Sequence, residues 1–593
     1  MKRMFKFFVC AAILAAGITG CSSEEGPGPG PDPGETSDVV EGIPTYATFK
    51  FYVNGDVDGK AMPNDAGAAE STAVNDIRLL IYNAKDSCEA NVLVDDAAHL
   101  AGGSPNAPKS ATVSVTSGIK KIFVIANASK STTLVNTALN AISKTGPTSL
   151  LSYFTSIVYD LDGGGSIVQA PLTKAPVADI STINTALLTL VDGASGKGLL
   201  MSNGVDANAV KTLVAQIDSI TSADSPPSPD GGTDLDPSKK TNTFDITIQR
   251  AVAKARVTYH NTAALTTTDK SGILSEVKYV FMNVNRAVYP FQYLGLAVAP
   301  NPSTSGAALT AYPQSPYFEN TYTENANEGN WKRYYYNYPI GELANMTDYA
   351  TTASATYPAY YVTENTQQLN HAKGNSSYVA VEGIFQPAGN HYITGAYEIA
   401  GQDSLKLLGS NFTVPASRLS ASPLSPMPTV LYQVRGGRGT ITGIVDSMFF
   451  TDRNTAYKVA YLINCVNASL TSQLNAFDPT NWKKVPTGFT LADSLSYDVE
   501  FNNSPNVALV SEFTGGKCYY SIRFKDPTTT PSTGVKRNHY YQFDITAFNG
   551  IGQEQIGDTN KPPTTPTEEG DTYITATLKV DIWRNVITNV VPD

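Results

Sequence analysis

An acidic segment near the start of the chain has residue types and spacing that suit calcium. Asn54, Asp56 and Asp58 place oxygen ligands at alternate positions, Gly59 follows them, and Asp65 falls where an EF-hand loop has its bidentate ligand. The segments on either side alternate like strands rather than helices, and Asp65 is shorter than the usual Glu. We therefore interpret the segment as a solvated loop.

Compact catalytic signatures are absent from the sequence. It contains no HExxH, GxSxG, P-loop or Rossmann fingerprint, and the glycines of residues 436–443 are better explained by a turn between strands. The histidines have no partner at ligand spacing; they are His99, His260, His371, His391 and His539. We predict a protein that is not an enzyme, with no cofactor and no metal, which disfavours a β-sandwich hydrolase.

An aromatic run at residues 334–338, just after Trp331, is the remaining candidate for binding chemistry. Exposed aromatic rings could stack on a glycan, but packing within an aromatic-rich strand or loop is the interpretation that we favour.

Composition favours an exported β protein. The 593 residues leave room for two to four domains, and only 16% of them are charged. A net charge of −11 provides no basic stripe to neutralise phosphates, so we predict no nucleic-acid partner.

The five cysteines permit little covalent cross-linking. Cys10 and Cys21 lie in or next to the leader, so Cys88, Cys465 and Cys518 allow at most one disulfide. Cys465 and Cys518 lie in strand-like apolar segments, and we interpret them as buried free thiols.

The N-terminus has the order of an export leader. Lys2, Arg3 and Lys6 precede a short apolar run at 7–18, which is too short to span a bilayer as a permanent helix. The residues that follow, Ile-Thr-Gly-Cys at 18–21, resemble the lipobox of bacterial lipoproteins.

This resemblance implies that residues 1–20 are a lipoprotein signal peptide and that Cys21 is acylated. The alternative is an ordinary secretory signal in which Cys21 is accidental. Residues 21–45 then form an acidic, Gly/Pro-rich tether, and the cluster at 22–25 resembles the surface-export signal of Bacteroidia lipoproteins.

The first half of the folded body mixes strands with a few helices. Ala47, Phe49, Phe51 and Val53 alternate within residues 46–53, which predicts a strand with one apolar face. Further strands are predicted at 77–82, 111–116 and 120–127.

Two segments have helical spacing. One runs from Leu134 to Ile142, with Ser131 or Thr132 as its cap. The other spans residues 210–217.

After the breaker-rich segment 222–242, the pattern becomes strongly β. Phe244, Ile246 and Ile248 alternate, and strand-sized runs follow; among them are 429–434, 457–463, 519–524 and 540–548.

The chain ends in a linker and a strand-like segment. Residues 553–570 are rich in breakers, and the segment 575–583 places four apolar residues on one face: Ala576, Leu578, Val580 and Ile582. Such a terminal strand can pair within its own domain or complete a sheet in a neighbouring molecule.

Several of these segments together resemble the type V fimbrillins of the Bacteroidia. They are the lipobox, KKIFVIAN at 120–127, GLLMS at 198–202 and IQRAVAKARV at 248–257. The end of the chain, RNHYYQFDITA at 537–547 followed by the linker and the strand with Trp583, is similar to the Mfa-type major-subunit branch.

The resemblance implies a mostly β fold with two tandem transthyretin-like β-sandwich domains, at 46–242 and 243–552, and a few helices in the first. It also implies assembly by donor-strand exchange. A protease removes the first strand (46–53), and the C-terminal strand of the next subunit, within the linker and donor region 553–593, takes its place. The donor residues are Ala576, Leu578, Val580, Ile582 and Trp583.

Proteolytic maturation in this family typically follows Arg, but no Arg lies between the lipobox and Arg78. We therefore predict cleavage between Lys60 and Ala61 by a trypsin-like or Arg/Lys-specific protease.

The function implied is that of the shaft (major) subunit of a surface fimbria that mediates adhesion and biofilm formation. Its partners are copies of itself, anchor and tip subunits, and host or bacterial surface ligands. Its location is the outer membrane as a lipoprotein precursor, then the fimbrium. The alternatives are an anchor or tip subunit and a surface glycan-binding lipoprotein.

Overall fold

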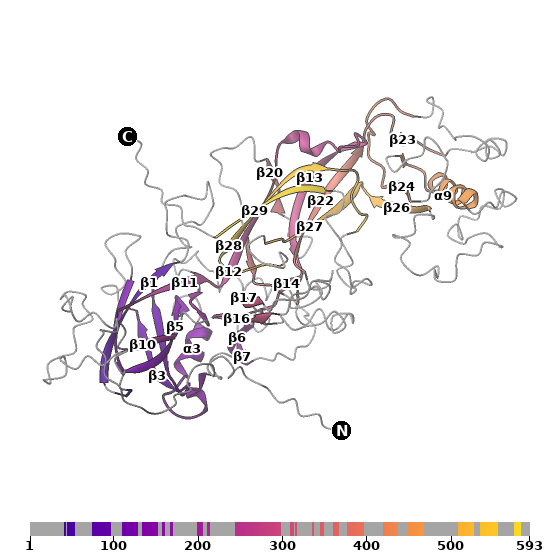
Figure 1. Ribbon diagram of the computed structural model, residues 1–593. Helices are drawn as coiled ribbons and strands as arrows, with labels where there is room; N and C mark the ends of the chain where they lie inside the picture. The colour runs from indigo at the N-terminus through magenta and orange to yellow at the C-terminus, as the bar shows by residue number, and fades with distance from the viewer. Residues whose placement is uncertain are drawn as a thin grey trace, which may run out of the picture.

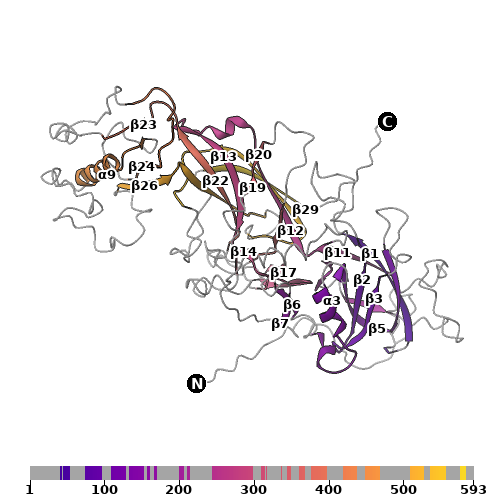
Figure 2. The same cartoon turned by 180° about the vertical axis from the view of Figure 1, so that it is seen from behind.

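The computed structural model describes residues 41–42, 44–53, 74–95, 109–128, 133–151, 157–160, 166–169, 199–205, 210–213, 243–297, 309–313, 315–316, 335–336, 344–348, 360–366, 376–396, 419–436, 448–467, 508–526, 534–555 and 574–582. These residues are mostly in strands, as the sequence predicts. They are arranged along one long axis, with the first sheet at one end and the longer helix at the other (Figures 1 and 2). The helical segments among them are α3 (Thr133–Asn140), α9 (Arg453–Asn467) and the short 3-10 turns η1 (Pro147–Ser149) and η6 (Thr262–Leu265).

The first sheet has the strand order β3-β2-β5-β8-β11-β1-β4, with β10 paired to β5. Its strands are β1 (Pro44–Val53), β2 (Ile77–Asn83), β3 (Cys88–Val94), β4 (Lys109–Thr116), β5 (Gly118–Ala126), β8 (Met201–Ser202), β10 (Val210–Leu213) and β11 (Thr243–Arg250). The two strands at the ends of this order, β3 and β4, also contact each other, so the sheet curls strongly. The strands predicted at 46–53, 77–82, 111–116 and 120–127 are confirmed as β1, β2, β4 and β5.

Helix α3 confirms the first predicted helix and is fastened to this sheet by polar side chains. Arg78 of β2 donates to Asn136 Oδ1 at 2.8 Å, and Asn91 of β3 donates to the Leu139 carbonyl at 2.8 Å. Val135 and Leu139, which are four residues apart on α3, are buried.

Two further sheets pack face to face in the middle of the molecule. One has the order β20-β12-β28-β29, with β21 paired to β12, and the other has the order β19-β13-β22-β27. Their strands are β12 (Val252–Tyr259), β20 (Thr347–Asp348), β21 (Tyr360–Thr363), β28 (His539–Phe548) and β29 (Ile574–Ile582), and β13 (Gly272–Met282), β19 (Ala344–Asn345), β22 (Tyr378–Pro387) and β27 (Lys517–Arg523). Ring contacts join the sheets: Phe524 lies 5.0 Å from Phe543, and Tyr520 lies 4.7 Å from Phe548. This is sandwich packing, while the transthyretin-like topology stays a prediction.

The remaining strands form smaller sheets. One lies beside α9 and contains β23 (Tyr392–Ile393), β24 (Val430–Gly436), β25 (Phe449–Phe450) and β26 (Ala508–Thr514). In two of the others, β14 (Val284–Asn285) pairs with β18 (Tyr335–Tyr336), and β16 (Gln292–Ala297) pairs with both β17 (Leu309–Pro313) and β9 (Gly204–Val205). In the last, β6 (Ile157–Asp160) lies between β15 (Ala287–Val288) and β7 (Ser166–Gln169) and pairs with both.

The strand predicted at 457–463 is wrong, because these residues lie inside α9. Asp452 starts the helix by accepting hydrogen bonds from the Thr455 backbone N–H at 2.8 Å and from its hydroxyl at 2.7 Å. Ala456 and Ala460 then recur at helical spacing and are both buried. The longer helix therefore lies in the second half of the chain, and Cys465 is helical rather than in a strand.

The helix predicted at 210–217 is also wrong for its described part. Residues 210–213 form β10, which pairs antiparallel with residues 118–121 of β5. On this side of β5, β8 pairs only with Ile125 and Ala126, so β10 supplies partners for backbone groups that a helix would leave unpaired.

The first sheet and the central sandwich are joined by continuous backbone. β11 leads through Ala251 directly into β12, and the Ala251 N–H donates to the Leu200 carbonyl at 2.9 Å. The chain therefore passes from one sheet to the next with a single intervening residue. β11 follows the predicted domain boundary at 242/243 yet belongs to the first sheet.

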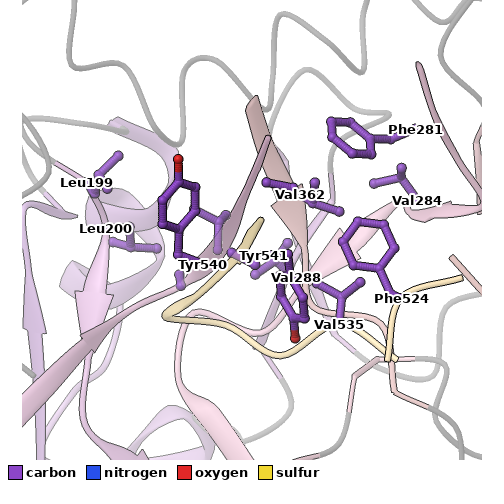
Figure 3. Packing of buried hydrophobic residues seen from close by; sticks show 14 of the residues in the cluster. Leu199, Leu200, Phe281, Val284, Val288, Val362, Phe524, Val535, Tyr540 and Tyr541 are labelled. Atoms are coloured by element: carbon purple, nitrogen blue, oxygen red, sulfur yellow. The ribbon is translucent and has the colours of Figure 1, made fainter. Parts of the chain in front are cut away.

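Buried polar groups lock this junction. The fully buried Arg250 donates from Nη1 to Asn538 Oδ1 at 2.9 Å, and the Asn538 N–H donates to the Val252 carbonyl at 2.9 Å. The neighbouring Arg537 is paired with Glu364 at 3.0 Å, with both side chains buried. The apolar residues around the junction belong to one core cluster, part of which Figure 3 shows from Leu199 and Leu200 to Phe524.

Replacing Asn538 tests the junction. Asn538→Gly removes one hydrogen-bond acceptor of Arg250, and glycine can adopt the local backbone angle, φ = +57°. We expect a loss of about 2 kcal/mol in the free energy of unfolding, because a hydrogen bond to a buried charged group is removed. Denaturant unfolding measures it.

The matched control is Asn390→Gly, since Asn390 has a similar backbone angle (φ = +66°) and is exposed. We expect its effect to stay within about 0.5 kcal/mol. Equal effects of the two substitutions would contradict a locked junction.

Candidate functional site

The predicted removable strand lies inside the first sheet rather than at its edge. β1 pairs in parallel with β11, from Thr48 opposite Thr243 to Val53 opposite Ile248. On its other side it pairs antiparallel with β4, from Pro44 opposite Thr116 to Phe51 opposite Lys109. Both edges of this N-terminal strand are therefore satisfied by backbone hydrogen bonds.

The inner face of β1 is part of the core. Ala47, Phe49 and Phe51 are buried, and Val53 packs partly buried against the same cluster. The ring of Phe49 stacks on Phe244 of β11 with centroids 5.9 Å apart. Burying side chains as large as phenylalanine stabilises by about 2–3 kcal/mol each, so β1 contributes strongly to this core.

The outer face of β1 is polar. Lys50 is exposed and stands opposite Asp245 of β11 in the strand register. Partial burial raises the pKa of Tyr52, and the negative charge of Asp245 and a hydrogen bond to it raise this pKa further. Opposite charges on neighbouring strands favour this register.

β4 depends on β1 for its strand pairing. Among the described residues, β1 is the only strand that forms a ladder with β4. A second attachment comes from Glu89 of β3, whose carboxylate accepts the Thr116 N–H and lies 2.6 Å from Lys120 Nζ. Lys120 also donates to Thr116 Oγ1 at 2.8 Å. We call Glu89, Thr116 and Lys120 the β3–β4 clasp.

The predicted donor strand, β29, occupies the edge of a central sheet. It pairs antiparallel with β28, from Ile574 opposite Phe548 to Ile582 opposite His539. Within the described part of the chain, β28 is its only ladder partner. Ala576, Leu578 and Val580 are half-buried against the core, less covered than the inner face of β1.

Other predicted site residues lie outside the described residues. They are Cys21, Lys60, Ala61 and Trp583, together with the acidic loop at 54–65. Ile582 is described only as the last residue of β29. Of the aromatic run, Tyr335 and Tyr336 form β18, which pairs with β14.

The described side chains include those of two cysteines, Cys88 and Cys518. Both are buried and free. Burial raises the pKa of the Cys88 thiol and raises the pKa of Cys518 to about 11, which keeps both as thiols at neutral pH.

The described residues meet the requirements of neither a metal site nor a membrane-spanning helix. No three His, Cys, Asp or Glu side chains within the ranges given above gather as metal ligands. The helices in those ranges are too short or too polar to cross a membrane.

One family matches the end of the chain. Residues 511–589 match the description "Major fimbrial subunit protein type IV, Fimbrillin, C-terminal". This part of the chain is therefore similar to the C-terminal region of a fimbrillin. The match confirms the fimbrillin resemblance for this part of the chain, and the matched residues include β27, β28 and the whole of β29.

Several solved structures are similar to this chain. A putative cell adhesion protein from Parabacteroides distasonis is 13% identical, with 93% of this chain and 99% of that chain covered and a TM-score of 0.36. A fimbrillin from Porphyromonas gingivalis is 13% identical (91% and 98% covered, TM-score 0.35). The tip fimbrial protein Mfa3 from the same species is 11% identical (91% and 100% covered, TM-score 0.30).

TM-scores below 0.5 do not by themselves establish a shared fold. No curated protein matches the chain.

Sequence patterns missed the β3–β4 clasp. Glu89, Thr116 and Lys120 come from three strands, and no local periodicity marks them as partners. Lys120 shares the period-two face of Ile122 and Val124 in β5, and a lysine on such an apolar face is the one signal that could have pointed to an internal carboxylate.

Two adjacent lysines allow a matched test of the clasp. Lys120→Met leaves Glu89 without its buried counter-charge, and we expect a loss of about 3 kcal/mol in the free energy of unfolding. Lys121→Met breaks only the partly exposed pair with Asp86, for which we expect less than about 1 kcal/mol. Denaturant unfolding of the uncleaved chain distinguishes them, and similar losses for both would argue against the clasp.

Proposed function

We propose that this chain is the structural shaft subunit of a surface fimbria and that it polymerises by donor-strand exchange. Cleavage between Lys60 and Ala61 releases β1, and β29 of the next copy takes its place. A lipid on Cys21 holds the precursor at the outer membrane until cleavage.

The observation that carries the proposal is the position of β1 as an interior strand at the N-terminal end of the fold. Cleavage at Lys60 would separate it from the rest of the chain, since the only covalent link from β1 to β2 runs through residues 54–76. Its loss would leave β4 and β11 each with an unpaired edge and would uncover apolar side chains on both, among them Val113 and Ile246. Such a site favours a replacement strand with one apolar face.

β29 has the properties of that replacement. It is similar in length to β1, and Ala576, Leu578 and Val580 alternate on one face. In its own sheet it pairs on one edge, whereas between β4 and β11 of a neighbour it would pair on both. Exchange would therefore increase its backbone hydrogen bonds and the burial of its apolar face.

The β3–β4 clasp would hold the end of β4 in position after β1 has been removed. Glu89 and Lys120 fasten Thr116, the last residue of β4, independently of β1. The two walls of the site would then stay apart at a fixed separation, which preorganises the site for the incoming strand.

A shaft role follows from having both parts of the exchange. A tip subunit has no need of a donor strand, and an anchor would keep β1 in place because its site must stay closed. The chain in the shaft would contact other copies of itself, anchor and tip subunits, and the surfaces to which the fimbria adheres. A glycan-binding lipoprotein is the alternative from another class, and it would act as a monomer without β1 cleavage.

Deleting the donor tests the function. A chain lacking residues 571–593 should be exported and folded yet form no filaments, whereas a chain lacking only 584–593 keeps β29 and Trp583 and should still polymerise. Electron microscopy of material sheared from cells, with limited proteolysis to check folding, measures both outcomes.

Filaments from the chain lacking 571–593 would contradict the proposal. If this deletion fails to fold, a Leu578→Asp, Val580→Asp chain keeps the whole backbone of β29 and should also fail to polymerise, because charges enter an apolar site.

A further inference from the structure

The strands at the two ends of the fold share a seven-residue pattern. Residues 47–53 of β1 read Ala-Thr-Phe-Lys-Phe-Tyr-Val, and residues 576–582 of β29 read Ala-Thr-Leu-Lys-Val-Asp-Ile. Ala, Thr and Lys are identical at the first, second and fourth positions, and the third, fifth and seventh are apolar in both. The sixth position, Tyr52 or Asp581, is the one that changes character.

From this correspondence we propose the direction and register of the exchange: β29 enters the next copy in the same direction as β1, with Ala576 in the place of Ala47. It then runs parallel to β11 and antiparallel to β4, as β1 does. The proposal rests on the function proposed above and specifies how the incoming strand is oriented and aligned between β4 and β11.

The alanine sets the direction. Ala47 is 1% exposed and stands opposite Val113 of β4, so its place in the core accepts a methyl group. In the proposed direction Ala576 fills that place, and Ile582 replaces Val53, a substitution of one β-branched residue by another. The opposite direction would put Ile582 into the alanine site and Ala576 into the Val53 site, overpacking one end and leaving a void at the other.

The lysine sets the register. Lys50 stands opposite Asp245 of β11 in the register, and Lys579 would take the same position, again with opposite charges on the neighbouring strands. A shift by one residue would turn the apolar face of β29 to solvent. A shift by two residues would move Lys579 away from Asp245 and Ala576 away from the Ala47 site. Lys579 is the middle residue of the matched segment, so it would stand opposite Asp245 whichever way β29 runs. The lysine therefore determines the register, and the alanine determines the direction.

Thr247 of β11 gives a direct test, because it is exposed and stands opposite Tyr52 of β1. In the proposed direction residue 581 of the next copy lies opposite Thr247, whereas in the opposite direction residue 577 does. Neighbouring strands are about 4.8 Å apart, within the Cα separation of a disulfide. In the chain's own sheet both positions pair with β28, away from β11.

The experiment uses full-length chains in filaments sheared from cells. Thr247→Cys, Asp581→Cys should give a ladder of covalent multimers on a non-reducing denaturing gel after mild oxidation. Thr247→Cys, Thr577→Cys should give none, and Thr247→Cys alone controls for the native cysteines.

A ladder from the 247/577 pair, or filaments with no ladder from the 247/581 pair, would overturn the proposed direction and leave the shaft function standing. Absence of filaments from the unsubstituted chain would overturn both. The two failures are therefore distinguishable.

Discussion

The backbone groups of β4 and β11 that face β1 constrain the first sheet more than any side chain does. A strand inside a sheet satisfies two rows of N–H and C=O groups at once, and an unpaired row in a buried setting is costly. Among the described residues no other strand pairs with β4, and the fully buried Phe49 fills the core beneath. The first sheet is thus complete with β1 in place, and the proposed removal of β1 would leave it incomplete.

The two terminal strands differ in how far their backbone groups are paired. β1 is paired on both edges and deeply buried, while β29 is paired on one edge and only half covered. A strand with one ladder can leave its sheet at lower cost than a strand with two. In the proposed mechanism, the donor strand therefore lies at an edge of its sheet and the strand to be cleaved lies in the interior of its own. The sheets that hold these two strands are connected by β11 and β12, which are separated by Ala251 alone. Asn538, next to the start of β28, binds Arg250 at that junction.

The sequence predicted both strands because each has one apolar face with a period of two. The alternation at Phe49 and Phe51, and again at Leu578 and Val580, is strong enough to show type, extent and inward face. The fimbrillin resemblance was carried by residues spread along the chain, and the match at 511–589 bears it out for the C-terminal region.

What the sequence did not predict depends on partners distant in the chain. The segment at 457–463 is as apolar as a strand, and only Asp452 as a cap and its packing beside β24 and β26 distinguish it as a helix. β10 takes its conformation from the free edge of β5. The clasp between Glu89 and Lys120 joins strands that no periodicity relates. Each of these is decided by tertiary pairing rather than by local pattern.

The N-terminus of the subunit in sheared filaments tests the central claim most directly. Edman sequencing or mass spectrometry of the filament protein should find a start at Ala61 or within a few residues of it, with no peptide from β1 in the polymer. A subunit that still begins at a lipidated Cys21 throughout the filament would mean that β1 stays in its sheet. That result would contradict assembly by replacement of β1.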